Sequence, residues 1–423
     1  MSNSSVINDN GDSEVYFPTV KSVIPEFSTR PELPSPAVSK EIGIFGILKH
    51  AIGKDLSRFA IPIVFNEPLS MLQRLAEYME YHRLLDQASA SEDPLKRIEL
   101  VTAFALSTLA SGNVRLSKPF NPLLFETFEF SEPELGFEFV AEQISHHPPI
   151  SAFFCKSKNF EFSGTVEPRI KFWGKSIEVL PNAQMNLKIL NKNETYSWRG
   201  CDCSINNIIL GKMYMALQGQ MVIKCPENDL QSIMKFRGSG KNGPDVVVTG
   251  EVVKLSNPEE HLRVIYGNWT EFLASTHWGS FQANKHIVEN EFKKNENLQN
   301  ERIIMFREGR LLWRVYKKPP NSANYYHMTY FSMMLNELPQ DPSKLPQTDA
   351  RFRPDMRFLE NGDVDKASKE KERLENKQRE KAKINEKKTK PFWFDQIKEN
   401  GTSKIVFNGR YFNRNFTDSE DIF

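Results

Sequence analysis

Cysteine is scarce in this chain of 423 residues, which has four: Cys155, Cys201, Cys203 and Cys225. So few thiols provide no disulfide framework, which favours a protein of a reducing compartment. Net charge is equally small, because 55 Lys and Arg are balanced by 54 Asp and Glu to give +1 at pH 7. Without a strong field of one sign, we expect no general affinity for nucleic acid.

Long hydrophobic runs and common catalytic motifs are missing as well. The longest apolar stretch, residues 98–110, is interrupted by Glu99 and by hydroxyl residues and is too short to cross a bilayer. The polar, acidic start of the chain does not resemble a secretory signal. There is no HExxH, no Cys/His pair at zinc spacing and no GxSxG. These absences argue against an enzyme and predict neither a metal nor a cofactor.

What the sequence does contain is a long series of β-strand patterns. From about residue 125, segments rich in Val, Ile, Phe and Trp are separated by turn clusters such as HHPP, NKNE and SGKNGPD. This texture predicts a large antiparallel sheet or barrel. No βαβ rhythm is present, which argues against a doubly wound fold. We therefore predict a β-rich α+β protein.

Helical patterns lie on both sides of the β-rich region. Residues 42–53 carry apolar side chains at i, i+3, i+4, i+7 and i+8, and on this pattern alone a core-packing helix is the favoured interpretation. Asn66-Glu67-Pro68 is predicted to open a second helix with an apolar face from Leu69 to Met79, and a third covers Ile98 to Leu109. Residues 366–390, with eleven Lys or Arg against five Glu, predict a charged helix.

The N-terminal residues 1–40 are rich in Ser, Asn and Pro, and we expect them to be mostly disordered. Within them, the acidic run ending in Glu14-Val15-Tyr16-Phe17 has a weak similarity to acidic-aromatic motifs that dock on endoplasmic-reticulum receptors. A plain flexible tail is the favoured interpretation of this segment.

The most specific motif is EQISHHPP at residues 142–149. Adjacent histidines make a poor metal chelate, because neighbouring side chains diverge on both a strand and a helix. Two interpretations remain from the residues alone, a turn stiffened by proline and the capture of an anion. Imidazole donates hydrogen bonds and a phosphate monoester accepts several, so His146 and His147 are candidates for phosphate binding.

EQISHHPP is similar to the fingerprint of the oxysterol-binding-protein-related family. Further segments resemble landmarks of that family in the same order: KPFNPLLFE at 118–126, KFWGKS at 171–176, PPNSA at 319–323, TDARFRPDMR at 348–357 and KEKERLENKQRE at 369–380. The resemblance covers roughly residues 41–423. It is greatest to the short members related to the first and second vertebrate proteins, and we expect a ligand-binding domain alone.

The resemblance implies an incomplete antiparallel β-barrel around a hydrophobic tunnel, with an N-terminal lid, flanking helices and a C-terminal helical subdomain. The amphipathic stretch 42–53 matches the lid, so the resemblance favours a lid over a core helix. Five parts are implied along the chain: a disordered tail (1–40), lid and hinge (41–62), a helical segment (63–120), the barrel (121–335) and the C-terminal subdomain (336–423).

The resemblance also implies the residues that bind lipid. The phosphoinositide headgroup would contact Lys118, Asn121, His146, His147, Lys371, Glu375 and Arg379. The lid hinge would contact the lipid through Leu56, Ser57, Arg58, Phe59, Ala60 and Ile61. Because Lys371, Glu375 and Arg379 are spaced i, i+4, i+8, they share one helix face, and we expect Glu375 to hold both cations. One departure is Phe125, which stands where the family has Gly.

The implied function is transfer of sterol, of a phosphatidylinositol phosphate (the 4-phosphate foremost) or of both, by exchange in one tunnel. The implied location is the cytoplasm, with transient peripheral contact with the endoplasmic reticulum and other cytosol-facing membranes. A second hypothesis is a lipid-regulated sensor or adaptor without net transport, which the basic helix would also hold on an anionic membrane surface. A third, a hydrolase using His146, lacks any nucleophile or metal constellation.

Overall fold

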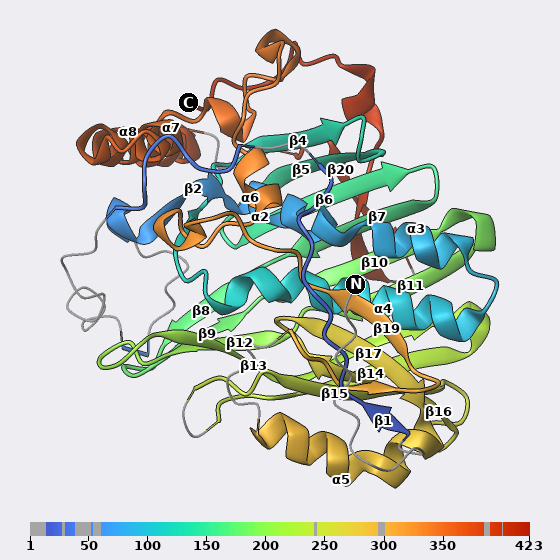
Figure 1. Ribbon diagram of the computed structural model, residues 1–423. Helices are drawn as coiled ribbons and strands as arrows, with labels where there is room; N and C mark the ends of the chain where they lie inside the picture. Colours follow the sequence, from blue (N-terminus) through green and yellow to red (C-terminus); the bar gives the residue numbers. More distant parts are fainter. Residues whose placement is uncertain are drawn as a thin grey trace.

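One sheet of 15 strands dominates the structure (Figure 1). The structure is a computed structural model that describes residues 14–27, 30–38, 52–53, 61–240, 243–294, 301–384, 390–399 and 401–423. Twelve strands are hydrogen-bonded neighbours in the following order: β19 (Arg310–Arg314), β17 (Phe272–His277), β16 (His261–Asn268), β15 (Val247–Lys254), β14 (Leu230–Arg237), β13 (Tyr214–Cys225), β11 (Glu194–Arg199), β10 (Gln184–Ile189), β7 (Phe160–Val166), β6 (Pro149–Ser157), β5 (Phe137–His146) and β4 (Thr127–Glu132).

Three further strands extend the sheet beside this path. β12 (Asp202–Asn206) pairs with β13 and with β9 (Ile177–Leu180), and β9 also pairs with β8 (Arg169–Phe172). Neighbouring strands of the sheet are antiparallel, and among the described residues its end strands β4 and β19 do not pair with each other. The predicted β-rich α+β fold with a large incomplete antiparallel barrel is therefore confirmed.

The alternation of side chains explains which face of the sheet is buried. In β10, buried Met185, Leu187 and Ile189 alternate with exposed polar residues, as expected for a strand with one covered face. In contrast, β5 is buried on both faces from Phe139 to Ile144. A second layer must therefore cover β5, and the C-terminal segment provides it.

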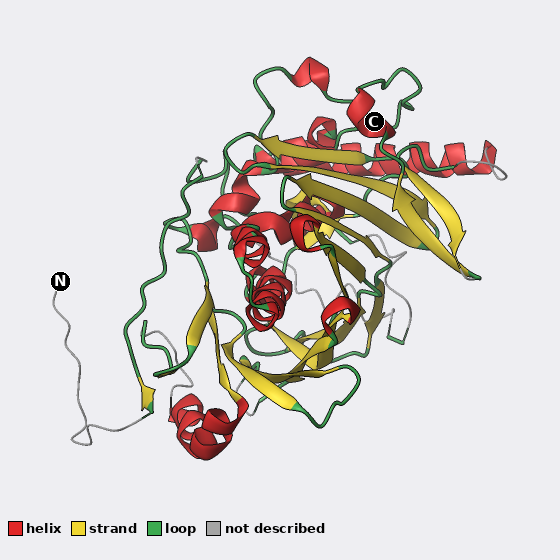
Figure 2. Cartoon of the chain, turned by 90° about the vertical axis from the view of Figure 1, so that its right-hand side faces the viewer, coloured by secondary structure: helices red, strands yellow, loops and turns green. Residues whose placement is uncertain are grey.

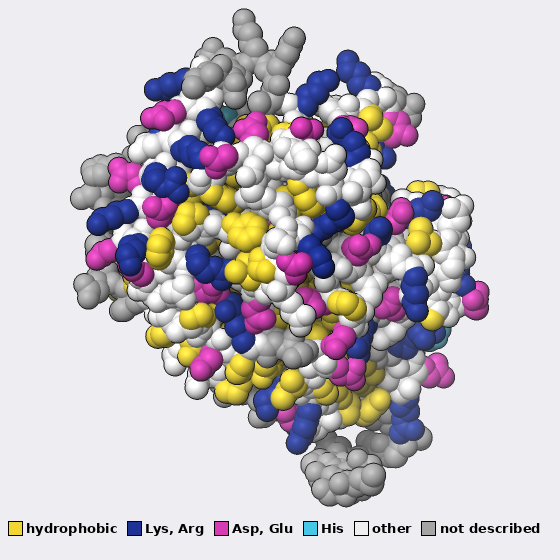
Figure 3. Space-filling view, turned by 90° about the horizontal axis from the view of Figure 1, so that it is seen from above, with side chains coloured by type: hydrophobic (Ala, Val, Ile, Leu, Met, Phe, Trp, Pro, Cys, Tyr) yellow, Lys and Arg dark blue, Asp and Glu magenta, His cyan; other side chains and the backbone are white. Residues whose placement is uncertain are grey.

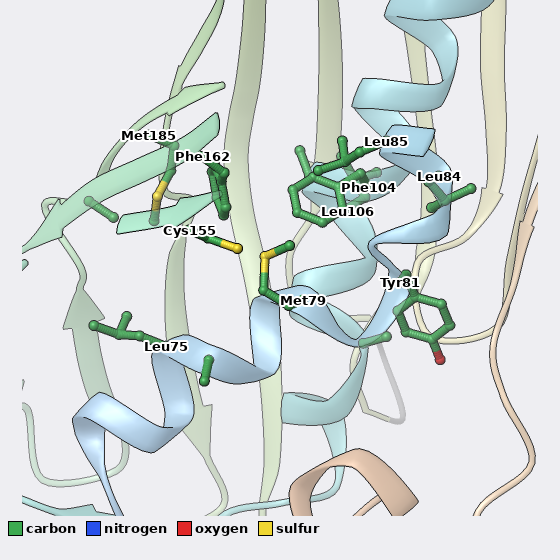
Figure 4. Packing of buried hydrophobic residues seen from close by; sticks show 14 of the residues in the cluster. Leu75, Met79, Tyr81, Leu84, Leu85, Phe104, Leu106, Cys155, Phe162 and Met185 are labelled. Carbon is green, nitrogen blue, oxygen red and sulfur yellow. The ribbon is translucent and has the colours of Figure 1, made fainter. Parts of the chain in front are cut away.

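Four helical segments cover the inner face of the sheet: α2 (Met71–Ala76), a 3-10 turn (Glu77–Tyr81), α3 (Arg83–Ala90) and α4 (Pro94–Ala110). The sheet curves around these helices (Figure 2), and α2 contacts β5 and β6 while α4 contacts β14 and β19. The side chain of Met79 points toward Cys155 of the sheet (Figure 4), and Leu75 and Met185 belong to the same buried cluster. Apolar burial between these two layers is the main stabilising interaction of the fold.

The predicted helix boundaries need one correction. Asn66–Ser70 is not the first turn of a helix but strand β2, which pairs in parallel with β3 (Lys118–Phe120). The helix begins afterwards, where the backbone N–H of Ser70 donates to the side chain of Gln73 (2.7 Å), as in a capping box. The third predicted helix is present as α4, whose N-cap Asp93 accepts a hydrogen bond from the backbone of Leu95.

The N-terminal segment differs from the expected disordered tail. Val15–Tyr16 forms strand β1 with β18 (Met305–Phe306), and residues 30–38 pack on the body through buried Leu33. Edge pairing and apolar burial order these residues despite their polar composition. Residues 1–13 lie outside the described part of the chain. Beside β1 lies α5 (Trp278–Lys294), which no sequence pattern had predicted.

The C-terminal region forms a layer over β5 and β6. Trp393, Phe394 and Tyr411 pack on Val140 and Ala152 of these strands. The elements that follow the sheet are α6 (Tyr330–Met334), α7 (Pro354–Glu360), α8 (Val364–Ile384) and the hairpin of β20 (Phe394–Glu399) and β21 (Thr402–Phe407). The charged helix predicted at 366–390 is present as α8 as far as Ile384, and residues 385–389 lie outside the described part of the chain.

Candidate functional site

A short loop after β3 forms the centre of the candidate site. The Asn66 amide donates to the carbonyl of Lys118 (3.1 Å), which joins β2 to β3. Glu126 Oε2 accepts from the backbone N–H of Leu123 (2.9 Å) and from Arg353 (2.8 Å), and Arg353 also donates to the carbonyl of Asn121 (2.8 Å). Because Glu126 and Arg353 are buried and paired, the loop that carries Asn121 is held firmly.

Phe125 occupies an unusual backbone conformation within this loop. Its φ is +69°, in the left-handed region that favours glycine. The ring is buried and packs edge-to-face on Phe392 with ring centroids 5.2 Å apart. The site of the family's Gly therefore keeps the glycine-like backbone, and aromatic packing offsets the strain.

Two lysines converge beside the loop from different parts of the chain. Lys118 Nζ donates to Asn121 Oδ1 (2.6 Å), and Lys371 Nζ, from α8, donates to the carbonyl of Ile61 (2.7 Å) and lies 3.4 Å from Glu375. Burial, together with the charges of Lys371 and Arg353, lowers the pKa of Lys118 to about 8, although Glu375 opposes this shift. The cluster therefore has more positive charge than its own acid neutralises.

The two histidines lie at the end of β5 and in the turn that follows. Their ring centroids are 4.4 Å apart, with His146 partly buried and His147 exposed. Burial, and next the charges of His147 and Arg353, lowers the pKa of His146 to about 4, so its ring is neutral near pH 7.

Gln378 of α8 sets the tautomer of His146. Its Oε1 accepts from the backbone N–H of Leu124 (3.0 Å), so its Nε2 must donate to His146 Nε2. The ring proton then lies on Nδ1, which is buried and makes no hydrogen bond within the described residues. His146 thus keeps one donor for a ligand.

The structure brings together most of the predicted headgroup residues. Lys118, Asn121, Lys371 and Glu375 form one cluster, and His146 is joined to the same loop and helix through Gln378. Arg379 differs from the expectation, because it is exposed and donates to Asn376 Oδ1, and the described ion pairs of Glu375 include Lys371 but not Arg379. Arg379 therefore shares the helix face of Lys371 and Glu375 but lies at its exposed end.

Most of the predicted lid and hinge falls outside the part of the chain that the structure describes. Leu56, Ser57, Arg58, Phe59 and Ala60 lie outside the described residues, as do residues 42–51. Ile61 is described, and its carbonyl accepts from Lys371 (2.7 Å). The end of the hinge therefore meets the cationic cluster.

Sequence reasoning missed Arg353 and Gln378. Arg353 lies within TDARFRPDMR, so the motif marked its segment but not its role. Gln378 lies between Lys371 and Arg379 on the charged helix, where nothing in the local pattern distinguishes it from solvated neighbours. Figure 3 views the molecule from the side of α8 and shows Lys and Arg side chains interspersed with Asp and Glu.

The described residues contain no group of three or more His, Cys, Asp or Glu side chains that could hold a metal ion. No helix among them has the length and apolar character needed to cross a membrane.

Residues 43–416 match the family model for oxysterol-binding protein. The chain belongs to the oxysterol-binding protein family. Human oxysterol-binding protein-related protein 1 is 40% identical over 93% of this chain, which spans 44% of that relative's length. Mouse oxysterol-binding protein-related protein 2 is 38% identical, with 93% of this chain and 88% of the relative covered.

Solved structures of the family share the fold. The Osh1 ORD domain in complex with cholesterol has a TM-score of 0.80 and 29% identity, with 94% of this chain and 95% of that chain covered. The Osh3 ORD of Saccharomyces cerevisiae in complex with PI(4)P has a TM-score of 0.77 and 30% identity, with 95% and 100% covered. These members of the oxysterol-binding protein family are lipid-binding domains and not enzymes.

Proposed function

We propose that this chain binds sterol and a phosphatidylinositol phosphate, the 4-phosphate foremost, and transfers them between membranes that face the cytosol. The observation that carries the proposal is the cationic cluster beside an unused imidazole donor. Burial, and next the repulsion from Lys371 and Arg353, lowers the pKa of Lys118 to about 8. A bound phosphate would relieve this repulsion.

A phosphate monoester suits the donors of the site. It carries up to two negative charges near neutral pH and offers three acceptor oxygens. Lys118 and Lys371 would supply charge, His146 would donate from Nδ1, and Asn121 and Glu375 would orient the two lysines. His147 and Arg379, being more exposed, would contact the outer part of the headgroup. The hinge at 56–61 would contact the glycerol and acyl part.

Exchange of two lipids in one tunnel is supported by the relatives rather than by this chain's own contacts. Solved neighbours with the same fold hold cholesterol or ergosterol in some structures and PI(4)P in another. An apolar tunnel would replace the bilayer around the lipid, so the cargo would not lose the roughly 25 cal/mol per Å² that exposing its apolar surface to water would cost. The protein would work in the cytoplasm, with transient contact with the endoplasmic reticulum and other membranes.

The decisive experiment measures transfer of labelled phosphatidylinositol 4-phosphate and of labelled sterol between liposomes. His146→Ala/His147→Ala is expected to slow phosphoinositide transfer by about tenfold or more, because charge-assisted hydrogen bonds to the phosphate are lost. Sterol transfer, which does not use these donors, should be nearly unchanged. His286→Ala, an exposed histidine on α5, is the matched control.

Each result has a distinct meaning. If the double variant transfers phosphoinositide at the wild-type rate, the histidines form only a structural turn and the site assignment is wrong. If the wild-type chain binds phosphoinositide but moves neither lipid, a sensor or adaptor is the correct function and transfer is excluded.

A further inference from the structure

Two neighbouring turns of the sheet expose large apolar side chains. Trp173, in the turn between β8 and β9, is 55% exposed. In the loop between β12 and β13, Ile209 is 52% and Leu210 is 87% exposed, and Leu210 is the most exposed large apolar side chain of the described residues. Such exposure is costly in water unless another surface covers it.

The two turns form one built surface. β9 pairs with both β8 and β12, and Phe172, Ile177 and Ile208 form a buried cluster directly beneath the turns. Phe172, Ile177 and Ile208 therefore anchor the turns. Trp173 and Ile209, which follow Phe172 and Ile208 in sequence, are exposed to solvent. β8, β9 and β12 lie below α8 in Figure 1, so this surface is separate from the helix that contributes to the headgroup site.

Hydrogen bonds fix the shape of both turns. The Trp173 N–H donates to the carbonyl of Ser176 (2.9 Å), and the Asn207 side chain donates to the carbonyl of Lys212 (3.2 Å). The Gly53 N–H donates to the carbonyl of Phe172 (2.7 Å), which places Ile52, 53% exposed, at the same surface. The apolar side chains are thus presented on rigid backbone, which lowers the entropy lost on docking.

The charged residues of the two turns themselves have one sign. Within residues 171–176 and 207–212 there are three lysines, Lys171, Lys175 and Lys212, all exposed, and no Asp or Glu. The indole of Trp173 donates to Glu178 (3.2 Å), which lies in β9 rather than in the turn. On α8, in contrast, cations pair with nearby acids, for example Lys371 with Glu375 and Arg373 with Glu370.

We propose that residues 171–176 and 207–212, called the docking tips below, insert into the surface of an anionic lipid bilayer. Tryptophan favours the interface of a membrane, where its ring meets apolar groups while its N–H keeps a polar partner, which for Trp173 is Glu178. Lysines beside it attract anionic headgroups, and Ile209 and Leu210 enter the acyl boundary. The inference deepens the proposed transfer function, on which its role rests, by naming the face that meets the membrane.

Flotation of the purified chain with vesicles tests the proposal directly. The vesicles contain phosphatidylcholine with or without phosphatidylserine, and neither sterol nor phosphoinositide, so the headgroup site is not engaged. Leu210→Asp is expected to lower the ratio of bound to free protein about tenfold, and Trp173→Ala by a similar factor. Lys175→Ala and Lys212→Ala should each lower it about fivefold, and only when phosphatidylserine is present.

Matched controls separate the docking tips from general changes of charge or hydropathy. Leu338→Asp alters another exposed leucine, 46% exposed, and Lys158→Ala removes an exposed lysine from the turn between β6 and β7. Both should float like the wild type. The proposal is overturned if Leu210→Asp and Leu338→Asp float equally, or if the wild-type chain does not bind protein-free vesicles, in which case a protein partner covers this face.

A second measurement distinguishes this proposal from the proposed function. Binding of a fluorescent sterol in solution needs no membrane, so variants of the docking tips should bind it normally while transferring it slowly between liposomes. Wild-type transfer rates in these variants would overturn the docking proposal. If the wild type floats through the docking tips but binds neither sterol nor phosphoinositide, docking stands and the transfer function falls.

Discussion

The protonation of Lys118 makes the affinity of the headgroup site for phosphate depend on pH. Burial and the charges of Lys371 and Arg353 lower its pKa to about 8, and Glu375 also faces it. A bound phosphate would raise this pKa. Below pH 8 Lys118 is protonated in both the free and the bound protein, so its contribution to affinity is constant. Above pH 8 the free protein loses this proton, and binding must recover it.

Affinity for a soluble phosphoinositide is therefore expected to decrease above pH 8, by at most about tenfold for each pH unit. Titration of binding between neutral and alkaline pH measures the effect. Lys118→Gln should bind more weakly at neutral pH and lose this alkaline decrease. The same decrease in the variant would assign the titration to another group.

Phe125 predicts an unusual order of stabilities. Substitution by Ala or Gly removes the buried ring, which costs about 3–5 kcal/mol. Because φ is +69°, Phe125→Gly also relieves the left-handed strain that Phe125→Ala retains. We expect the Gly variant to be more stable than the Ala variant by about 1 kcal/mol, as measured by urea denaturation.

Phe130 provides the control for this comparison. It is equally buried, at 3%, but lies in strand β4 with no left-handed backbone. At Phe130 the Gly variant should be the less stable one, by about 0.5–1 kcal/mol. If the order is the same at both positions, the backbone of Phe125 is not strained.

Among the elements, the C-terminal hairpin is attached to the sheet by Glu142. Its carboxylate accepts from the backbone N–H groups of Phe392 (2.8 Å) and Trp393 (2.9 Å). Burial raises the pKa of Glu142 to about 7, although these donors oppose the shift. Within EQISHHPP, Glu142 therefore holds the hairpin, whereas His146 and His147 belong to the candidate site.

Glu142→Ala is expected to loosen the hairpin, because two buried N–H groups lose their acceptor. A loss of about 3 kcal/mol is expected for docking of this segment, seen as faster hydrogen exchange in residues 390–407. Exchange within α8 should change less. Glu138→Ala, on the same strand but exposed and paired with Lys156, should leave the hairpin protected. Unchanged exchange in Glu142→Ala would contradict the anchoring role.

Sequence patterns predicted some of the helices and strands and missed others. Alternation and apolar composition predicted the sheet, and helical periodicity predicted α4 and α8. Residues 169–180, however, divide into β8 and β9 around Gly174, and α5 was missed because its apolar residues are few and widely spaced.

In the site, motif similarity indicated Lys118 and Lys371. Arg353 and Gln378 act across 227 and 232 positions, on Glu126 and His146, and no local pattern reports such partners.

At the scale of the whole molecule, the N-terminal segment closes the structure against the region after the sheet. It buries Val15 and Leu33, and its Arg30 pairs with the buried carboxylate of Glu360. Deletion of residues 1–38 is expected to lower the free energy of unfolding by about 4 kcal/mol, mostly from two lost apolar side chains. Chemical denaturation measures this loss. Deletion of residues 1–13 alone removes none of these contacts and should have no such effect. If the two truncated chains are equally stable, residues 14–38 do not stabilise the fold, as expected for a disordered tail.

The contact between Phe125 and Phe392 makes the order of substitutions matter in the history of this chain. A loss of the Phe392 ring leaves the left-handed backbone of Phe125 without its compensating contact, whereas a return to Gly at 125 leaves a void beside Phe392. Either single step is costly, and the two together are cheaper than their sum. Positions 125 and 392 are therefore expected to vary as a pair among relatives, with Gly at the first wherever the second is small.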